Sequence, residues 1–128
     1  MHTETTLVTG LLIIAHGSRN MASVEEIHRL VDAIRARNLE FDAVECAFLE
    51  MADPDIYTGV THLVKLGVTD IKILPYFLAR GNHVARDIPG IVESLLSEFP
   101  ALSIETLPHI GLSDQMTQLI IDHVLDKS

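Results

Sequence analysis

Short runs of consecutive apolar residues alternate along the chain with longer segments in which apolar positions recur every three or four residues. Consecutive apolar residues are typical of strands that a sheet buries on both faces. The runs end near Ala15, Leu49, Leu78 and Leu107, at intervals of 34, 29 and 29 residues, which is the spacing of strand-plus-helix units. The pattern therefore predicts four strands, at residues 11–15 (with a start as early as Leu7), 43–49, 71–78 and 102–107.

Each of the four periodic segments carries a sequence signal for the start of a helix. A capping box, an aspartate before a proline, or a serine cap precedes the apolar stripe in each case. These signals are Ser23 with Glu26, Asp53-Pro54 (with Gly67 closing that helix), residues 87–89, and Ser113. In the last helix the periodicity predicts an inward face made of Met116, Leu119, Ile120 and Val124.

This alternation predicts an α/β fold in which a parallel four-stranded sheet has helices on both faces. We expect the flavodoxin-like strand order 2-1-3-4, in one domain spanning residues 1–128. Pro75 conflicts locally with the third strand because proline lacks the N–H group that a central ladder needs. It marks either a bulge or the true end of that strand.

Composition narrows the classes of function. Nine Lys and Arg residues against 18 Asp and Glu give a net charge of -9, which argues against a general nucleic-acid binder and against binding to anionic membranes. A single cysteine, Cys46, excludes an intramolecular disulfide and any multi-cysteine metal site. No apolar run approaches the length of about 20 residues that spans a bilayer, and residues 1–10 contain no Lys or Arg, so we expect a cytoplasmic protein.

The seven histidines direct attention to the carboxyl ends of the strands, where open α/β sheets bind ligands. His16 follows the first strand, Glu50 the second and His83 the third. In the order 2-1-3-4 these three residues share one rim, and two imidazoles with a carboxylate suit a divalent metal that keeps an open position. Taken singly, a histidine after a strand is more often a hydrogen-bonded loop residue, and Glu50 is also compatible with a solvated residue before the Asp53 cap. His109 follows the fourth strand, farther from this point, and remains a weaker candidate.

Three of the nine basic residues, Arg19, Arg80 and Arg86, flank the two motif histidines. Arginine binds carboxylates through a planar two-pronged fork, so these side chains are candidates for holding an acidic ligand. Pairing with Asp87 or Glu50 explains the same residues equally well.

Several motifs, in order along almost the whole chain, resemble the sirohydrochlorin chelatase family of CbiX/SirB type. They are residues 14–19 (IAHGSR), 48–50 (FLE) with 54–56 (PDI), 74–78 (LPYFL), 81–83 (GNH) and 87–89 (DIP). The resemblance implies an ATP-independent class II chelatase. It also implies a short family member that completes its active cleft by homodimerisation.

Carried over by position, the resemblance marks His16 and His83 as the metal-binding and catalytic pair and Glu50 as the supporting carboxylate. It implies sirohydrochlorin, a polycarboxylate tetrapyrrole, as substrate, with Co²⁺, Fe²⁺ or Ni²⁺ as the inserted metal and no further cofactor. The substrate-binding candidates are Ser18, Arg19, Arg80, Gly81, Asn82 and Arg86.

Two other classes of function remain open at this point. One is a metallohydrolase or phosphotransferase on the same fold, although the chain has no P-loop and no GxGxxG pattern. The other is a non-catalytic metallochaperone or tetrapyrrole carrier, which would bind the pigment without metallating it.

Overall fold

A computed structural model describes residues 7–37, 40–79 and 81–126, with the backbone alone at 82–85. Strands and helices alternate as expected, with a short 3₁₀ helix, η1 (Ile110–Leu112), after the last strand. The strands are β1 (Thr9–Ala15), β2 (Ala43–Phe48), β3 (Asp70–Pro75) and β4 (Ser103–Thr106). The helices are α1 (Met21–Arg37), α2 (Ile56–Lys65), α3 (Asn82–Glu98) and α4 (Met116–Val124).

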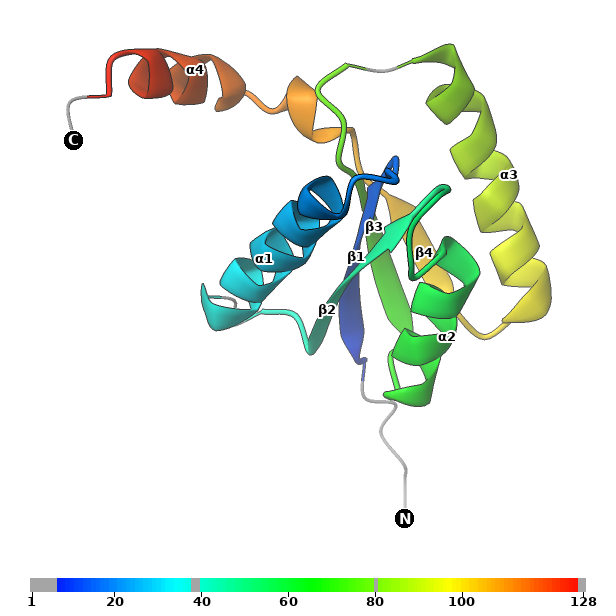
Figure 1. The fold of residues 1–128 in the computed structure, drawn as a ribbon. Coiled ribbons are helices and arrows are strands. Elements are labelled where there is room, and N and C mark those ends of the chain that lie inside the picture. The colour runs from blue at the N-terminus through cyan, green and yellow to red at the C-terminus, as the bar shows by residue number, and fades with distance from the viewer. Residues whose placement is uncertain (1–6, 38–39, 80, 127–128) are drawn as a thin grey trace.

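The strands form one parallel sheet in the order β2-β1-β3-β4, which confirms the predicted topology. In the register, Ile13 of β1 lies beside Cys46 of β2 and Leu74 of β3. Figure 1 shows α1 on one face of this sheet and α2 and α3 on the other. All four carboxyl ends point to the same edge, at the top of that view. The fold thus brings the loops after the strands together.

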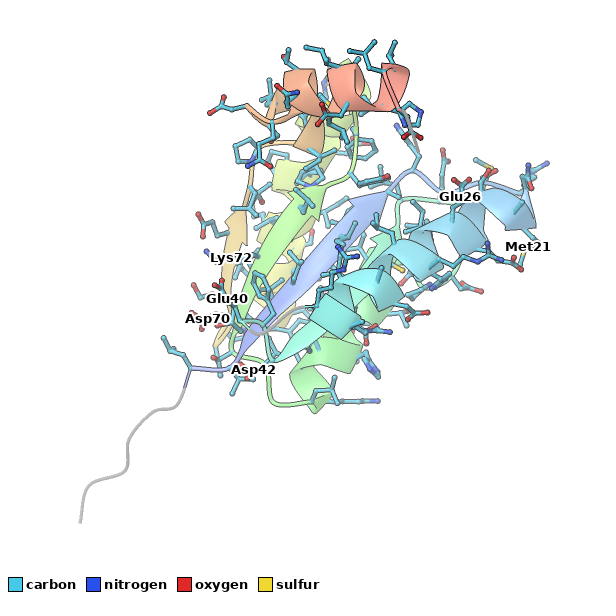
Figure 2. The ribbon with its side chains drawn as sticks, turned by 90° about the vertical axis from the view of Figure 1, so that its left-hand side faces the viewer. Met21, Glu26, Glu40, Asp42, Asp70 and Lys72 are labelled. Atoms are coloured by element: carbon cyan, nitrogen blue, oxygen red, sulfur yellow. The ribbon has the colours of Figure 1, made fainter. Side chains whose placement is uncertain are left out.

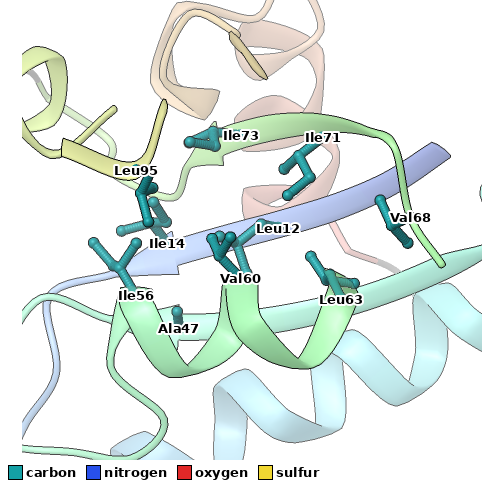
Figure 3. Close-up of a cluster of buried hydrophobic side chains, with 10 residues drawn as sticks. All are labelled: Leu12, Ile14, Ala47, Ile56, Val60, Leu63, Val68, Ile71, Ile73 and Leu95. Carbon is teal, nitrogen blue, oxygen red and sulfur yellow. The ribbon is translucent and has the colours of Figure 1, made fainter. Parts of the chain in front are cut away.

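Alternate residues of β1 supply the two cores, one on each face of the sheet. Leu12 and Ile14 pack with α2 and α3, whereas Leu11 and Ile13 pack beneath α1. The first of these clusters is drawn in Figure 3. Complete burial of such a side chain stabilises a fold by about 1.5–3 kcal/mol. The consecutive apolar residues of β1 are therefore explained by burial on both faces.

Pro75 is the last residue of β3, which decides between the two interpretations of this proline. The next residue, Tyr76, donates its N–H to the Ile14 carbonyl at 2.8 Å, so the ladder continues for one further bond. Because the missing donor falls at the end of the strand, the sheet accommodates it without a bulge.

Three helix starts differ from the sequence prediction. Helix α1 begins at Met21, where the Asn20 side chain accepts the Ala22 N–H at 2.9 Å, and not at the Ser23 capping box. Helix α2 is capped by Asp55, whose Oδ1 accepts the Thr58 N–H at 2.8 Å, so Asp53-Pro54 precedes the helix.

Helix α3 begins at Asn82, five residues before the predicted start, and contains Pro89 in its interior. A proline near an aspartate is typical of a first helical turn, and that preference led to the late start. In the structure the apolar face of α3, which includes buried Ile88 and Leu95, packs toward the sheet. This packing stabilises the helix on both sides of Pro89.

Helix α4 departs most from expectation. None of its residues is buried in the described chain, so the predicted inward face of Met116, Leu119, Ile120 and Val124 is wrong for this arrangement. Figure 1 shows α4 extending away from the sheet at the carboxyl edge. Among the described residues, no helix combines the length and the apolar character that crossing a membrane requires.

Candidate functional site

Backbone hydrogen bonds join the loops that follow β1 and β2. The Leu49 N–H donates to the Ala15 carbonyl at 3.0 Å, and the Glu50 N–H donates to the His16 carbonyl at 3.1 Å. These bonds extend the parallel ladder by two residues beyond Phe48. They hold His16 and Glu50 side by side in the backbone, with both residues exposed at the carboxyl edge.

Gly17 makes this junction possible. Its φ angle is +98°, and a Cβ atom at this position would lie 1.7 Å from the Glu50 carbonyl oxygen. A side chain is therefore excluded both by the backbone conformation and by the neighbouring loop. Gly17 therefore sets how closely the two candidate loops approach each other.

An aromatic contact orients the His16 imidazole. The His16 and Phe77 ring centroids are 4.5 Å apart with the planes inclined at 68°, an edge-to-face arrangement. Phe77 is itself buried against Ile88 of α3. The imidazole therefore rests on a ring that the body of the protein holds in place.

A cavity of about 650 Å³ opens beside His16, between the loops after β1 and β2 and the α3 helix. It contains three of the predicted site residues: His16, Glu50 and Arg86. This volume lies in the range of small-molecule sites. The remaining lining residues are Leu49, Tyr57, Asp87, Gly90, Ile91, Ser94, Leu95 and Glu98.

The charges that line the cavity are predominantly acidic. Glu50, Asp87 and Glu98 contribute carboxyl groups, and Arg86 contributes a guanidinium. Such a lining attracts a cation more strongly than an anion. A carboxylate and an imidazole are also suitable ligands for divalent transition metals, so the chemistry of this lining fits a metal ion in transit.

The other predicted site residues are distributed differently. The Ser18 hydroxyl accepts the Asn20 N–H at 3.0 Å and lines a separate small hollow against α1, so it belongs to the turn that starts this helix. Arg19 is exposed and is not part of the cavity lining. Gly81 caps α3 in an open position, where an added Cβ would meet no atom within 4 Å.

Some of the side chains predicted to form the site, including that of His83, lie outside the part of the chain that the structure describes. Arg80 and the side chains of Asn82 and His83 lie outside the described residues, although the backbone of His83 is in the first turn of α3. Within the part of the chain that is described, no three His, Cys, Asp or Glu side chains form a metal-binding group. His109 lines a second, apolar cavity with Phe77.

Sequence analysis missed several residues of the cavity. Tyr57 lies in the first turn of α2, and Glu98 is the last residue of α3. Outside the cavity, the contact of Phe77 with His16 was also not predicted. The separation of Tyr57 and Glu98 from the strand ends in the sequence gives no local signal of a shared site. Packing of the two helices on the same face of the sheet creates that proximity.

Cys46 does not belong to the site. Its side chain is buried beneath α1, with Sγ 3.5 Å from Nδ1 of His28. Burial raises the pKa of the thiol above its ordinary value, because the charged thiolate is poorly solvated there. A protonated, enclosed thiol is a poor metal ligand and a poor nucleophile.

Comparisons with known proteins show which family and which solved structures the chain is similar to. A family model described as CbiX matches residues 10–127. The sirohydrochlorin ferrochelatase of Bacillus subtilis (strain 168) is 28% identical over 116 residues, which cover 91% of this chain and 44% of that protein. The sirohydrochlorin cobaltochelatase of Methanocaldococcus jannaschii is 37% identical over 86 residues, 65% of this chain and 59% of that protein. The chain spans about half the length of the curated relatives it matches.

Two solved structures share the fold. The sirohydrochlorin chelatase SirB of Bacillus subtilis subspecies spizizenii, solved in complex with cobalt, matches with a TM-score of 0.84 and 26% identity over 94% of this chain and 51% of its own. A chain described as a CbiX protein of cobalamin (vitamin B12) biosynthesis, from Marinobacter aquaeolei VT8, matches with a TM-score of 0.81 and 27% identity over 93% of this chain and 96% of its own.

Proposed function

The chain belongs to the CbiX family, and from this premise we propose that it inserts a divalent metal ion, cobalt first, into sirohydrochlorin without ATP. The observation that carries the proposal is the pairing of His16 with Glu50. Their loops are joined by backbone hydrogen bonds, and both side chains line one open cavity at the carboxyl edge. A site with an imidazole, a carboxylate and an acidic lining suits both a metal ion and the removal of protons.

Insertion requires the tetrapyrrole to release two pyrrole N–H protons as the metal ion sheds water and binds the ring nitrogens. In the proposed mechanism, neutral His16 and His83 hold the metal or accept those protons, and Glu50 passes protons to solvent. Contact with Phe77 keeps the His16 imidazole in one orientation, which favours repeated proton transfer in the same geometry.

Because its lining is acidic, we propose that the cavity binds the metal ion and not the carboxylates of the substrate. With three carboxyl groups and one guanidinium in the lining, the cavity repels a polycarboxylate periphery. Arg86 lines the cavity and Arg19 is exposed outside it. We propose that these arginines bind substrate carboxylates at different points around the rim. The macrocycle would then lie over the mouth of the cavity, with the metal below.

We further propose that the working unit is a homodimer. The chain aligns with 51% of the SirB chain, and in this proposal a second copy supplies a counterpart of the remainder. A cleft between two copies would also enclose a macrocycle that a single open cavity leaves exposed. The cytoplasmic location and the single domain over residues 1–128 stay predictions.

Metallation of sirohydrochlorin, followed by absorbance, tests the function. We expect His16→Ala and His83→Ala to lose most of the rate, because each removes a nitrogen that holds metal or accepts a proton. His62→Ala is the matched control. His62 lies on α2, where it pairs with Glu45 at 2.9 Å, away from the cavity. Wild-type rates in both site variants would contradict the assignment.

Two further measurements separate the alternatives. Anaerobic competition between Co²⁺, Fe²⁺ and Ni²⁺ is expected to yield mainly the cobalt product, and a predominance of another metal would correct that choice. A pigment spectrum that shifts in proportion to protein, without turnover, would instead identify a carrier. Hydrolysis of a generic phosphoester by the pure protein would identify a hydrolase.

A further inference from the structure

Helix α4 has a broad apolar face, and none of its residues is buried in the described chain. With 3.6 residues per turn, the apolar residues occupy a little over half of the circumference, with Thr117 and His123 among them. On the opposite side the Gln118 amide donates to Asp122 at 2.8 Å. A helix with such a face normally packs it against another element. The exposed apolar residues in and just after α4 are Leu119, Ile120, Ile121, Val124 and Leu125, each at least 44% exposed.

The start of α4 is fixed to the edge that carries the candidate site. In η1 the Gly111 N–H donates to the Phe77 carbonyl at 3.0 Å, and a Cβ on Gly111 would lie 1.7 Å from the Leu78 carbonyl oxygen. Phe77 is the residue whose ring contacts His16. Only residues 113–115 separate η1 from α4. Any protein surface that packs against α4 must therefore lie close to this edge of the sheet.

In the part of the chain that the structure describes, one face of the sheet has no helix over β3 and β4 (Figure 2). On the same face, α1 buries Leu11 and Ile13 of β1 together with Val44 and Cys46 of β2. The register continues this face onto Lys72, Leu74 and Glu105, none of which is buried. Figure 2 looks onto this face, with no described helix in front of β3 and β4.

This open face of β3 and β4 has an apolar and a polar half. Lys72 and Glu105 form an ion pair at 2.7 Å in the polar half. Toward the carboxyl edge lie Leu74, half-buried at the margin of the cluster beneath α1, and, just beyond the strand, the exposed Tyr76. The nine residues of α4 form a helix about 14 Å long, which is short enough to cover the apolar half and leave the ion pair in solvent.

We propose that two copies of the chain exchange α4, so that each α4 packs on the open β3–β4 face of the other copy. The exchange supplies a layer over that face and buries the apolar face of α4, which the described part of its own copy leaves exposed. It also joins the copies at the edge where each carries His16 and Glu50. The inference deepens the homodimer in the proposed function and rests on it.

The relative SirB favours a second copy as the occupant. This chain aligns over 94% of its length with 51% of the SirB chain, so SirB has room for a second unit of this size in one polypeptide. A second copy of this chain would match that unit in size. Exchange of an identical element is a low-cost route to a symmetric dimer because both interfaces are the same.

Charge substitution on α4 provides the first test. We expect Leu119→Asp to halve the molar mass measured by light scattering, because a carboxylate cannot be buried at the exchanged interface. The neighbouring Gln118→Asp adds the same charge on the polar strip and is expected to remain dimeric. Circular dichroism verifies that both variants fold. A Leu119→Asp variant that stays dimeric, or a wild-type chain that is monomeric, would overturn the exchange.

Cross-linking tests which surface α4 reaches. Cys46 is the chain's single cysteine and is buried, so introduced thiols are the reactive ones. An Ile120→Cys copy and a size-tagged Tyr76→Cys copy are co-expressed and treated with a short bis-maleimide. We expect a cross-linked heterodimer, and none when Ser97→Cys on exposed α3 replaces Tyr76→Cys. If Ile120→Cys and Tyr76→Cys cross-link only within a doubly substituted chain, α4 folds onto its own body and the proposal is wrong.

Metallation by the wild-type chain distinguishes failure of the exchange from failure of the proposed function. If the wild type metallates sirohydrochlorin and Leu119→Asp remains a dimer, the exchange fails and the chelatase assignment stands. If the wild type gives no metallation but the mass and cross-linking results are as expected, the exchange stands and the chelatase assignment fails.

Discussion

Gly17 is the residue on which the junction of the two candidate-site loops depends, and Gly67 offers a matched control. Both have positive φ angles, of +98° and +91°, but an added Cβ would strike the Glu50 carbonyl at Gly17 and meet nothing within 4 Å at Gly67. We expect Gly67→Ala to lower the free energy of unfolding by about 1–2 kcal/mol through backbone strain alone, with metallation unchanged.

We expect Gly17→Ala to cost more stability than Gly67→Ala and to lose metallation as well, because His16 and Glu50 must separate to admit the methyl group. Denaturant titration and the absorbance assay measure the two effects. Equal metallation rates in the two variants would show that the junction of the loops is not needed for activity.

Phe77 is expected to act by positioning His16. Phe77→Leu keeps an apolar side chain but removes the edge-to-face contact, a type of interaction that contributes about 0.5–1.5 kcal/mol. If that contact acts on the reaction, kcat falls by roughly 2- to 13-fold, and the pH profile of metallation changes because the imidazole is held differently. Phe41→Leu, in the cluster beneath α1, is the control for lost packing. Identical kcat values and pH profiles in both variants would argue against positioning.

At the scale of elements, the start of α2 makes a pH-dependent contribution to stability. The Thr58 N–H bonded to Asp55 lowers the pKa of this carboxyl below its ordinary value of 3.8. A lowered pKa in the folded state means that the contribution is complete above the ordinary value and is lost as the pH falls through the lowered one. Asp55→Ala is expected to lower the free energy of unfolding by about 1 kcal/mol at pH 7, and the difference should shrink below about pH 4.

Asp53→Ala is the control for this cap, because the sequence pattern favoured Asp53 and the structure assigns the hydrogen bond to Asp55. Urea titrations of both variants between pH 3 and pH 7 make the comparison. A larger loss of stability at Asp53 would place the cap where the sequence pattern suggested.

For the whole molecule, an exchanged dimer predicts that stability and activity depend on protein concentration. Dissociation would uncover α4 and open the cleft, so mass action should raise the melting temperature as concentration increases. The rate of metallation per chain should fall on dilution, over the same concentrations at which light scattering detects dissociation. A rate per chain that stays constant while the dimer dissociates would show that one copy suffices.

The apolar pattern and the βα spacing by themselves determined the four strands and their parallel direction, because both are local properties of the chain. The flavodoxin-like order expected from them then placed His16 and Glu50 at one edge. Tertiary structure alone decided where α3 begins and which distant residues meet. The apolar face of α3 overrides Pro89, and Tyr57 and Glu98 reach the cavity only through helix packing. For α4 the sequence identified an apolar helix correctly, but not what it packs against. The periodicity shows that α4 has an apolar face that must be buried. Only the folded arrangement shows that the described part of the same chain leaves this face exposed.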